Sequence, residues 1–211
     1  MAYDLQEQEQ LDAIKTWWKD YGGWVSTLLI VTLASYAAWS GWRFYQARQA
    51  SAARVLYEAV EAKLAANQLP AAVAVKQSLQ QQYPKTVYAS RATLKVAAAE
   101  FNARQLSQAS QDLVWVSTQA DEPAVQDIAK LRLATVYLDS KQYPQALAQL
   151  AAIKDTGIAG NVSVLKGDIL VAQGKPAEAK VAYRVALEQL PKENTLRAVI
   201  ELKSDALGMV K

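Results

Sequence analysis

The sequence predicts an all-α protein in which a single membrane-spanning helix precedes an α-solenoid of about three to four helix pairs with a C-terminal capping helix. Three observations predict this fold. An uncharged segment near the N-terminus is long enough to cross a bilayer. Short turn-like segments recur through the rest of the chain, and strand signals are nearly absent. The expected parts are an acidic tail over 1–20, a transmembrane helix over 21–43 and a repeat domain over 44–211.

The predicted anchor runs from Gly22 to Trp42 without a charged residue, between Asp20 and Arg43. A helix of this length reaches roughly 31 Å at about 1.5 Å per residue, close to the thickness of the hydrocarbon core. A buried core helix is one alternative, but it would need a larger protein around it. A cleaved secretory signal is the other, but it requires a short basic leader, whereas the first twenty residues hold five acids and two lysines. We therefore expect a permanent anchor.

Aromatic side chains gather at both ends of this segment, as is typical of helices that cross a membrane interface. The expected membrane-interface residues are Trp17, Trp18 and Trp24 at one end and Trp39 and Trp42 at the other. The charges beside the span leave its orientation open. They favour a cytoplasmic C-terminal domain slightly, but such counts govern short loops and not long domains.

Composition argues against an enzyme. The chain has no cysteine and no histidine, so it lacks the commonest general base, the most reactive nucleophile and the main soft metal ligands. From Arg43 onward the chain has 21 basic and 15 acidic residues, and this mild balance of +6 is spread along the sequence, which argues against nucleic-acid binding. We expect no catalytic residue, cofactor, metal site, nucleic acid or small-molecule substrate.

Four similar segments, NQLPAA, RQLSQA, KQYPQA and GKPAEA, begin at Asn67, Arg104, Lys141 and Gly174, at intervals of 37, 37 and 33 residues. Each is predicted to be the turn between two helices, because apolar residues at three- and four-residue spacing flank it. No glycine or proline interrupts Trp42 to Gln68, so the membrane helix is expected to continue toward the first turn.

The residues around these turns resemble the tetratricopeptide repeat. The third unit carries the pattern at Leu133, Ala134, Tyr137, Tyr143, Ala146 and Leu150, and the fourth at Gly167, Gly174, Ala179, Tyr183, Ala186 and Pro191. The second unit departs from it, because Glu100 stands where the repeat favours tyrosine. The first keeps only Ala72 and Pro84. A terminal helix is expected to cap the stack through Leu196, Val199, Ile200, Leu202 and Leu207, with Asn194 as its N-cap.

Resemblance to this repeat implies a concave groove lined by the first helix of each pair. The groove residues that it implies are Arg91, Leu94, Phe101 and Asn102 in the second unit, Leu131, Thr135, Leu138 and Asp139 in the third, and Asn161, Val164, Asp168 and Val171 in the fourth. This row is mixed with a strong apolar component, which favours an apolar helix or extended segment as its partner. Alternatively, its apolar members pack inside the superhelix.

The order of the parts resembles the YfgM family, the ancillary subunits of the bacterial SecYEG translocon. The resemblance lies in QEQEQLDAIKTWWKDYGGW (Gln6–Trp24), GWRFY (Gly41–Tyr45) and VLKGDILVAQGKPAEAKVAY (Val164–Tyr183). It implies a single-pass protein of the inner membrane with a cytoplasmic N-terminus and a periplasmic repeat domain. The implied partners are the SecYEG translocon and a PpiD-type periplasmic chaperone, and the implied role is to assist biogenesis of exported proteins. A cytoplasm-facing scaffold or stress-response regulator is the alternative.

Overall fold

The computed structural model describes residues 2–209, and within that range it contains nine α-helices, one short 3-10 helix and no strand. Met1, at the start of the predicted acidic tail, and residues 210–211, at the end of the predicted repeat domain, lie outside the described residues. So do the side chains of residues 2–8 and of Met209. The chain divides into two compact units, one up to Gln49 and one from Ala50 onward.

The first unit is helical throughout its described residues. Helix α1 spans Ala2–Ala65, so it supplies all the described residues of this unit and the start of the next. It is the one helix in the described range that is long and apolar enough to cross a bilayer. Its aromatic residues pair along the helix, and the Arg43 guanidinium lies 4.9 Å from the centre of the Trp39 ring. The arginine at the end of the uncharged segment thus packs on a predicted interface residue.

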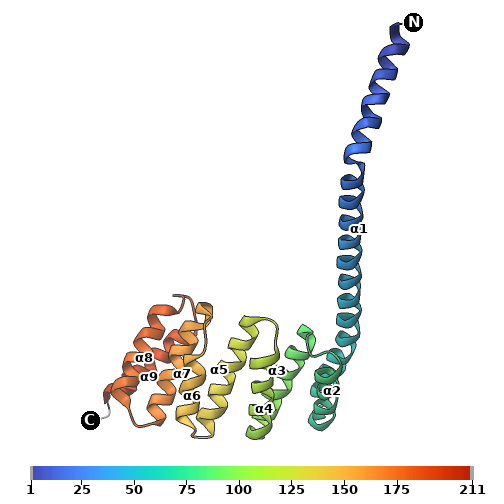
Figure 1. Cartoon of the computed structure of the whole chain (residues 1–211). Coiled ribbons are helices and arrows are strands. Elements are labelled where there is room, and N and C mark those ends of the chain that lie inside the picture. The colour runs from blue at the N-terminus through green and yellow to red at the C-terminus, as the bar shows by residue number, and fades with distance from the viewer. Residues whose placement is uncertain (1, 210–211) are drawn as a thin grey trace. The chain divides into compact units, whose positions relative to one another are not determined.

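The second unit is a stack of four helix pairs and a terminal helix (Figure 1). The end of α1 pairs with α2 (Leu69–Gln82), since Ala53 and Val60 share a buried cluster with Ala72 and Leu79. The remaining elements are α3 (Val87–Asn102), α4 (Leu106–Gln119), α5 (Pro123–Asp139), α6 (Tyr143–Ala151), the 3-10 helix Thr156–Ile158, α7 (Ala159–Ala172), α8 (Pro176–Gln189) and α9 (Leu196–Met209). The predicted number of helix pairs is confirmed, and the predicted membrane helix continues toward the first turn as expected. The first unit, which keeps only two residues of the repeat pattern, is also a helix pair.

The four predicted turns share one backbone geometry. The first residue of each repeated segment has a positive φ, +56° at Asn67, +61° at Arg104, +58° at Lys141 and +74° at Gly174. In the third turn the backbone N–H of Lys141 donates to the carbonyl of Leu138, and that of Gln142 donates to the carbonyl of Tyr137. This pair of bonds is the Schellman motif, which ends a helix with a left-handed residue. The repeat seen in the sequence is therefore a repeat of helix ends.

Small residues set the distance between the helices of a pair. A Cβ atom added at Gly167 of α7 would overlap the ring of Tyr183 on α8, and one added at Gly160 would come within 2.7 Å of Leu190. Ala134 and Ala146 are fully buried at corresponding places between α5 and α6. The close approach lets the large apolar residues around these positions fill the core.

The terminal helix is present, but it caps the stack with fewer residues than predicted. The side-chain oxygen of Asn194 accepts the N–H of Leu196 at 2.9 Å, so the predicted N-cap is confirmed. Ile200 is buried and Leu207 packs beside it against α8. The expectation that all five apolar residues would pack inward is wrong, because α9 is packed on one side only and its far side faces solvent. Val199 and Leu202 lie on or near that side, and Leu196, at the start of the helix one turn before Ile200, is also exposed.

A buried charge cluster joins α2, α3 and α4. The Lys76 ammonium donates to both carboxylate oxygens of Asp112, at 2.6 and 2.7 Å. Glu100 is 2% exposed beside this pair, and its Oε2 has no hydrogen-bond partner among the residues that the structure describes. Burial, reinforced by the Asp112 charge and opposed by that of Lys76, raises the pKa of Glu100 to about 7. The residue that departs from the repeat pattern is thus a carboxyl group titrating near neutral pH.

Candidate partner-binding groove

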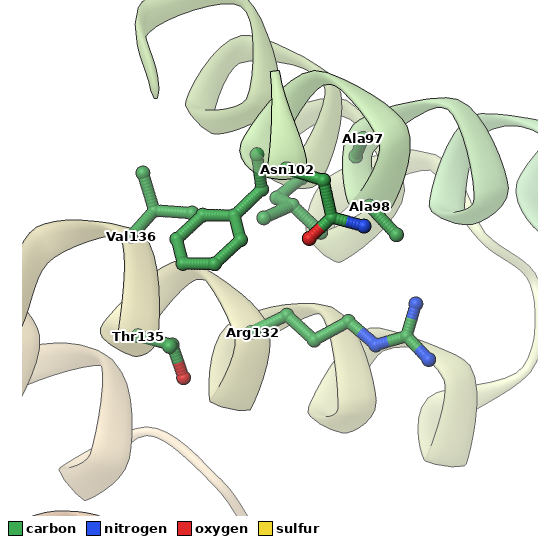
Figure 2. A pocket seen from close by; sticks show the side chains of 8 residues that line it. Ala97, Ala98, Asn102, Arg132, Thr135 and Val136 are labelled. Carbon is green, nitrogen blue, oxygen red and sulfur yellow. The ribbon is translucent and has the colours of Figure 1, made fainter. Parts of the chain in front are cut away.

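A pocket of about 210 Å³ lies between α3 and α5, the first helices of the second and third pairs (Figure 2). Its walls are mostly apolar, and Arg132, Asn102 and Thr135 supply polar groups. The residues that line it are Ala97, Ala98, Phe101, Asn102, Leu113, Arg132, Thr135 and Val136. In Figure 2 the side chains of Ala98 and Asn102 face those of Arg132 and Thr135 across the pocket. A space of this size and lining is suited to one apolar side chain of another polypeptide.

Three of the predicted groove residues, Phe101, Asn102 and Thr135, meet at this pocket. Asn102 is exposed, Thr135 is half-buried, and Phe101 is half-buried against the core of the second and third units. The Thr135 hydroxyl donates to the carbonyl of Leu131 at 3.2 Å, within its own helix. The repeat pattern therefore predicts three residues that line the pocket, two on α3 and one on α5.

Most of the other apolar residues predicted for the groove are also packed within the solenoid. Leu94 is buried in the core between the second and third units. Leu131 and Leu138 are half-buried against the cluster of α5, α6 and α7, and Val164 is half-buried against that of α7, α8 and α9. Val171 is exposed. The alternative expectation was that the apolar groove residues pack inside the superhelix. It describes four of them: Leu94, Leu131, Leu138 and Val164.

The polar residues of the predicted groove differ in how freely they could meet a partner. Arg91 and Asn161 are exposed. The Asp139 carboxylate accepts from the Arg104 guanidinium at 2.9 Å, at the turn after α3. Asp168 is the most committed, since it accepts from the Tyr183 hydroxyl at 2.6 Å and from the Lys203 ammonium at 2.7 Å.

Asp168 therefore ties α7 to both α8 and α9. Burial of Tyr183, together with its bond to the Asp168 carboxylate, raises the pKa of the tyrosine hydroxyl, so it stays a hydrogen-bond donor at all physiological pH. Both bonds end on Oδ1, so the Tyr183 hydroxyl and the Lys203 ammonium fix the position of this carboxylate. Asp168 therefore has a structural role in joining the three helices.

Five pocket residues were missed by projecting the repeat pattern: Ala97, Ala98, Leu113, Val136 and Arg132. The Nη1 atom of Arg132 donates to the carbonyl of Leu94 at 3.3 Å, so its side chain reaches from α5 to α3 beside the pocket. The adjacent alanines at 97 and 98 are the sequence feature that could have predicted the pocket. Two small side chains on a first helix leave space that a facing helix at its usual distance does not fill.

Taken together, a helix of membrane-spanning length and a stack of helix pairs with an apolar inner pocket define a class of protein, the helical-repeat scaffold with an N-terminal candidate membrane helix. Residues 15–209 match the family described as a tetratricopeptide repeat-like domain. A protein of Neisseria gonorrhoeae, named ancillary SecYEG translocon subunit, is 38% identical over 98% of this chain and 100% of its own length.

Proteins with the same name in Haemophilus influenzae and Escherichia coli are 27% and 23% identical. The first alignment covers 88% of this chain and 91% of the relative, and the second covers 86% and 87%. The chain belongs to this family of ancillary SecYEG translocon subunits, the YfgM family. A translocon-subunit family built on a repeat-like domain is one of interaction scaffolds, which bears out the expectation that the protein is not an enzyme.

Proposed function

We propose that this protein is a non-enzymatic scaffold, anchored in the inner membrane, that associates with the SecYEG translocon and brings a periplasmic chaperone of the PpiD type to it. Its N-terminus lies in the cytoplasm and its repeat domain in the periplasm, where it assists the biogenesis of exported proteins. The observation that carries the proposal is the relationship over full length to the Neisseria protein, which includes both the uncharged helix and the solenoid.

The anchor raises the effective concentration of the scaffold beside its membrane-bound partners. Two proteins held beside each other in one membrane meet at a high effective concentration, so each contact between them needs only modest affinity. A single pocket that takes one apolar side chain is consistent with such a contact. The Trp residues predicted for the two interfaces, Trp17, Trp18, Trp24, Trp39 and Trp42, are all exposed on α1, as a helix surrounded by lipid requires.

The test of anchoring and orientation uses the full chain in cells. The protein should stay in the membrane pellet after an alkaline wash, and a reporter that is active only in the periplasm should be active when fused to the C-terminus. A freely soluble product would refute the anchor. A reporter active only in the cytoplasm would instead support the alternative, a cytoplasm-facing scaffold or stress-response regulator.

The test of the pocket is a substitution that fills it without disturbing the core. Leu131 and Leu138 are unsuitable because they pack against buried residues. Ala98 is exposed on α3 and lines the pocket, so Ala98→Trp should block it. The matched control is Ala148→Trp, at an exposed alanine on the second helix α6.

Affinity purification of the tagged full chain is the measurement. We expect the wild type and the Ala148→Trp variant to bring down both the translocon and the chaperone, and the Ala98→Trp variant to lose the chaperone severalfold. Loss of the translocon from the wild-type sample would refute the association itself. Unchanged chaperone recovery with Ala98→Trp would refute the assignment of the pocket.

A further inference from the structure

Helix α9 is packed on one side only. Each earlier first helix, α3, α5 or α7, contacts the preceding pair and also its own second helix. Helix α9 occupies the place of a fifth first helix, and it packs against α8 through Ile200 and Leu207. Its Lys203 bonds to Asp168 on the same inner side. The opposite side of α9 lies where a second helix would complete a fifth pair.

That opposite side is apolar. Leu202 is 72% exposed and Val199 is 49% exposed, and Ala198 and Ala206 are exposed beside them. Their spacing of three and four residues places them in one stripe along the helix. The last helix of a solenoid needs a polar outer face for solubility, so a stripe of this kind marks a surface that another element covers.

The stripe has an acidic edge. Glu201 and Asp205 are four residues apart and exposed, and at about 100° per residue they lie beside Ala198 and Leu202. Neither carboxylate makes an ion pair within residues 2–209. The charge next to the apolar stripe is therefore left for a partner to complement.

We infer that the outer face of α9, formed by Ala198, Val199, Leu202 and Ala206 with the acidic edge of Glu201 and Asp205, binds an amphipathic helix of another protein. That helix carries lysine or arginine along one edge of its apolar face, and it extends the solenoid by the second helix of a fifth pair. The inference rests on the proposed role as a scaffold and adds a docking surface separate from the pocket between α3 and α5. Helix α9 has 14 residues, so a partner helix of about four turns covers it.

Charge argues against two other occupants. In an antiparallel pair of α9 helices, the acidic edges of the two copies would lie side by side and repel each other. An anionic lipid surface would meet the carboxylates of Glu201 and Asp205 with the same sign. A helix with a basic edge satisfies both the apolar stripe and the acidic edge.

The experiment uses the full chain in nanodiscs of zwitterionic lipid and two fluorescent probe peptides. Both are stapled helices of about four turns with one leucine face, because short peptides are weakly helical in water. They differ only in their edge, which is lysine in one and glutamate in the other. Binding is measured by fluorescence anisotropy, with empty nanodiscs subtracted. We expect the lysine-edged peptide to bind saturably, and the glutamate-edged peptide to bind at least about tenfold more weakly.

Variants then assign the site. Leu202→Glu should weaken the lysine-edged peptide roughly tenfold or more. Val181→Glu, at a valine that is 54% exposed on α8, should leave binding unchanged. The double variant Glu201→Lys with Asp205→Lys should reverse the preference in favour of the glutamate-edged peptide. Reversal of the preference separates this site from nonspecific association with leucine side chains.

Three results would overturn the inference: no saturable binding, binding indifferent to Leu202→Glu, or no change in preference on charge reversal. A concentration-dependent dimer in sedimentation, abolished by Leu202→Glu, would assign the face to a second copy and overturn the proposed occupant. The peptide assay contains no translocon. The proposed scaffold role is tested separately. It would be refuted if affinity purification of the wild-type chain did not recover the translocon.

Discussion

Glu100 allows a quantitative prediction about how stability depends on pH. Its pKa is about 7 in the folded protein, against 4.5 for an ordinary glutamate, because the carboxyl group is buried beside the Asp112 carboxylate. The folded state therefore holds this proton more tightly than the unfolded state. The resulting stabilisation is complete below pH 4.5 and is lost as the pH rises through about 7.

The gap of about 2.5 pKa units corresponds to about 3 kcal/mol, at 1.36 kcal/mol per unit. Glu100→Gln keeps the shape of the side chain and removes the titration. We expect the variant to match the wild type near pH 4.5 and to exceed its stability by up to about 3 kcal/mol at pH 8. For a domain of this size that is a rise in Tm of roughly 6–12 °C.

The assay is thermal unfolding of the full chain in detergent micelles, followed by circular dichroism at a series of pH values. Glu188→Gln is the control, since Glu188 is exposed on α8. It should retain the wild-type dependence on pH. If wild-type stability is flat between pH 5 and 8, or if Glu100→Gln keeps the wild-type slope, the account of a buried, near-neutral carboxyl group is wrong.

Three further substitutions test the packing of the solenoid by urea unfolding. Gly167→Ala should destabilise by roughly 2 kcal/mol, because the new methyl group meets the Tyr183 ring, whereas Gly208→Ala, which meets only a flexible lysine tip, should be neutral or stabilising; equal effects would contradict the close approach. Asp127→Ala should cost about 3 kcal/mol, since this buried carboxylate accepts two backbone N–H groups of the segment between α6 and α7 and pairs with a lysine. Although burial alone would raise the Asp127 pKa, these bonds hold it below its usual range, so its stabilisation is lost on acidification through that lowered pKa, and a variant equally sensitive to acid would refute this account. Lys141→Gly should stabilise by up to about 1 kcal/mol, because it relieves the left-handed backbone at φ +58°, and a loss of stability would show that the lysine side chain matters more than the turn.

The positions of the turns could be predicted from sequence because each depends on local chemistry. A helix that ends in a left-handed residue leaves the same short pattern of turn and N-terminal residues every time. The repetition from Asn67 to Gly174 exposed that pattern even though only Gly174 is a glycine. Because nearby residues set the geometry of a helix end, the regular spacing of these segments predicts where the helices end.

The inner surface was harder to predict because it depends on how neighbouring pairs are rotated against each other. Leu131 and Leu138 occupy groove positions of the repeat pattern, yet both pack against residues of α6 and α7. The pocket opens instead where Ala97 and Ala98 leave space opposite Arg132. Which side of a first helix lies inward is set by the twist between pairs, and no single helix carries that information.

The pKa of Glu100 could not be predicted from the sequence for a different reason. The departure of Glu100 from the repeat pattern was visible in the sequence, but its consequence depends on Lys76 and Asp112, which reach it from α2 and α4. A buried acid beside an ion pair has one more negative charge than the lysine neutralises. Burial is the main cause of the raised pKa of Glu100, whose Oε2 has no hydrogen-bond partner among the described residues, and the Asp112 charge adds to it.

The existence of helix α9 could be predicted from its sequence, but how much of it is covered depends on packing. Five apolar residues predicted a cap, and a helix with that many apolar positions has more apolar surface than neighbours on one side can cover. Helix α8 covers Ile200 and Leu207, and the stripe containing Val199 and Leu202 is left outside. If α9 served only to close the solenoid, polar residues at these positions would raise solubility with little effect on its packing against α8. An uncovered stripe with acids on one edge therefore follows from a requirement other than closure of the solenoid, and recognition of a further helix meets that requirement.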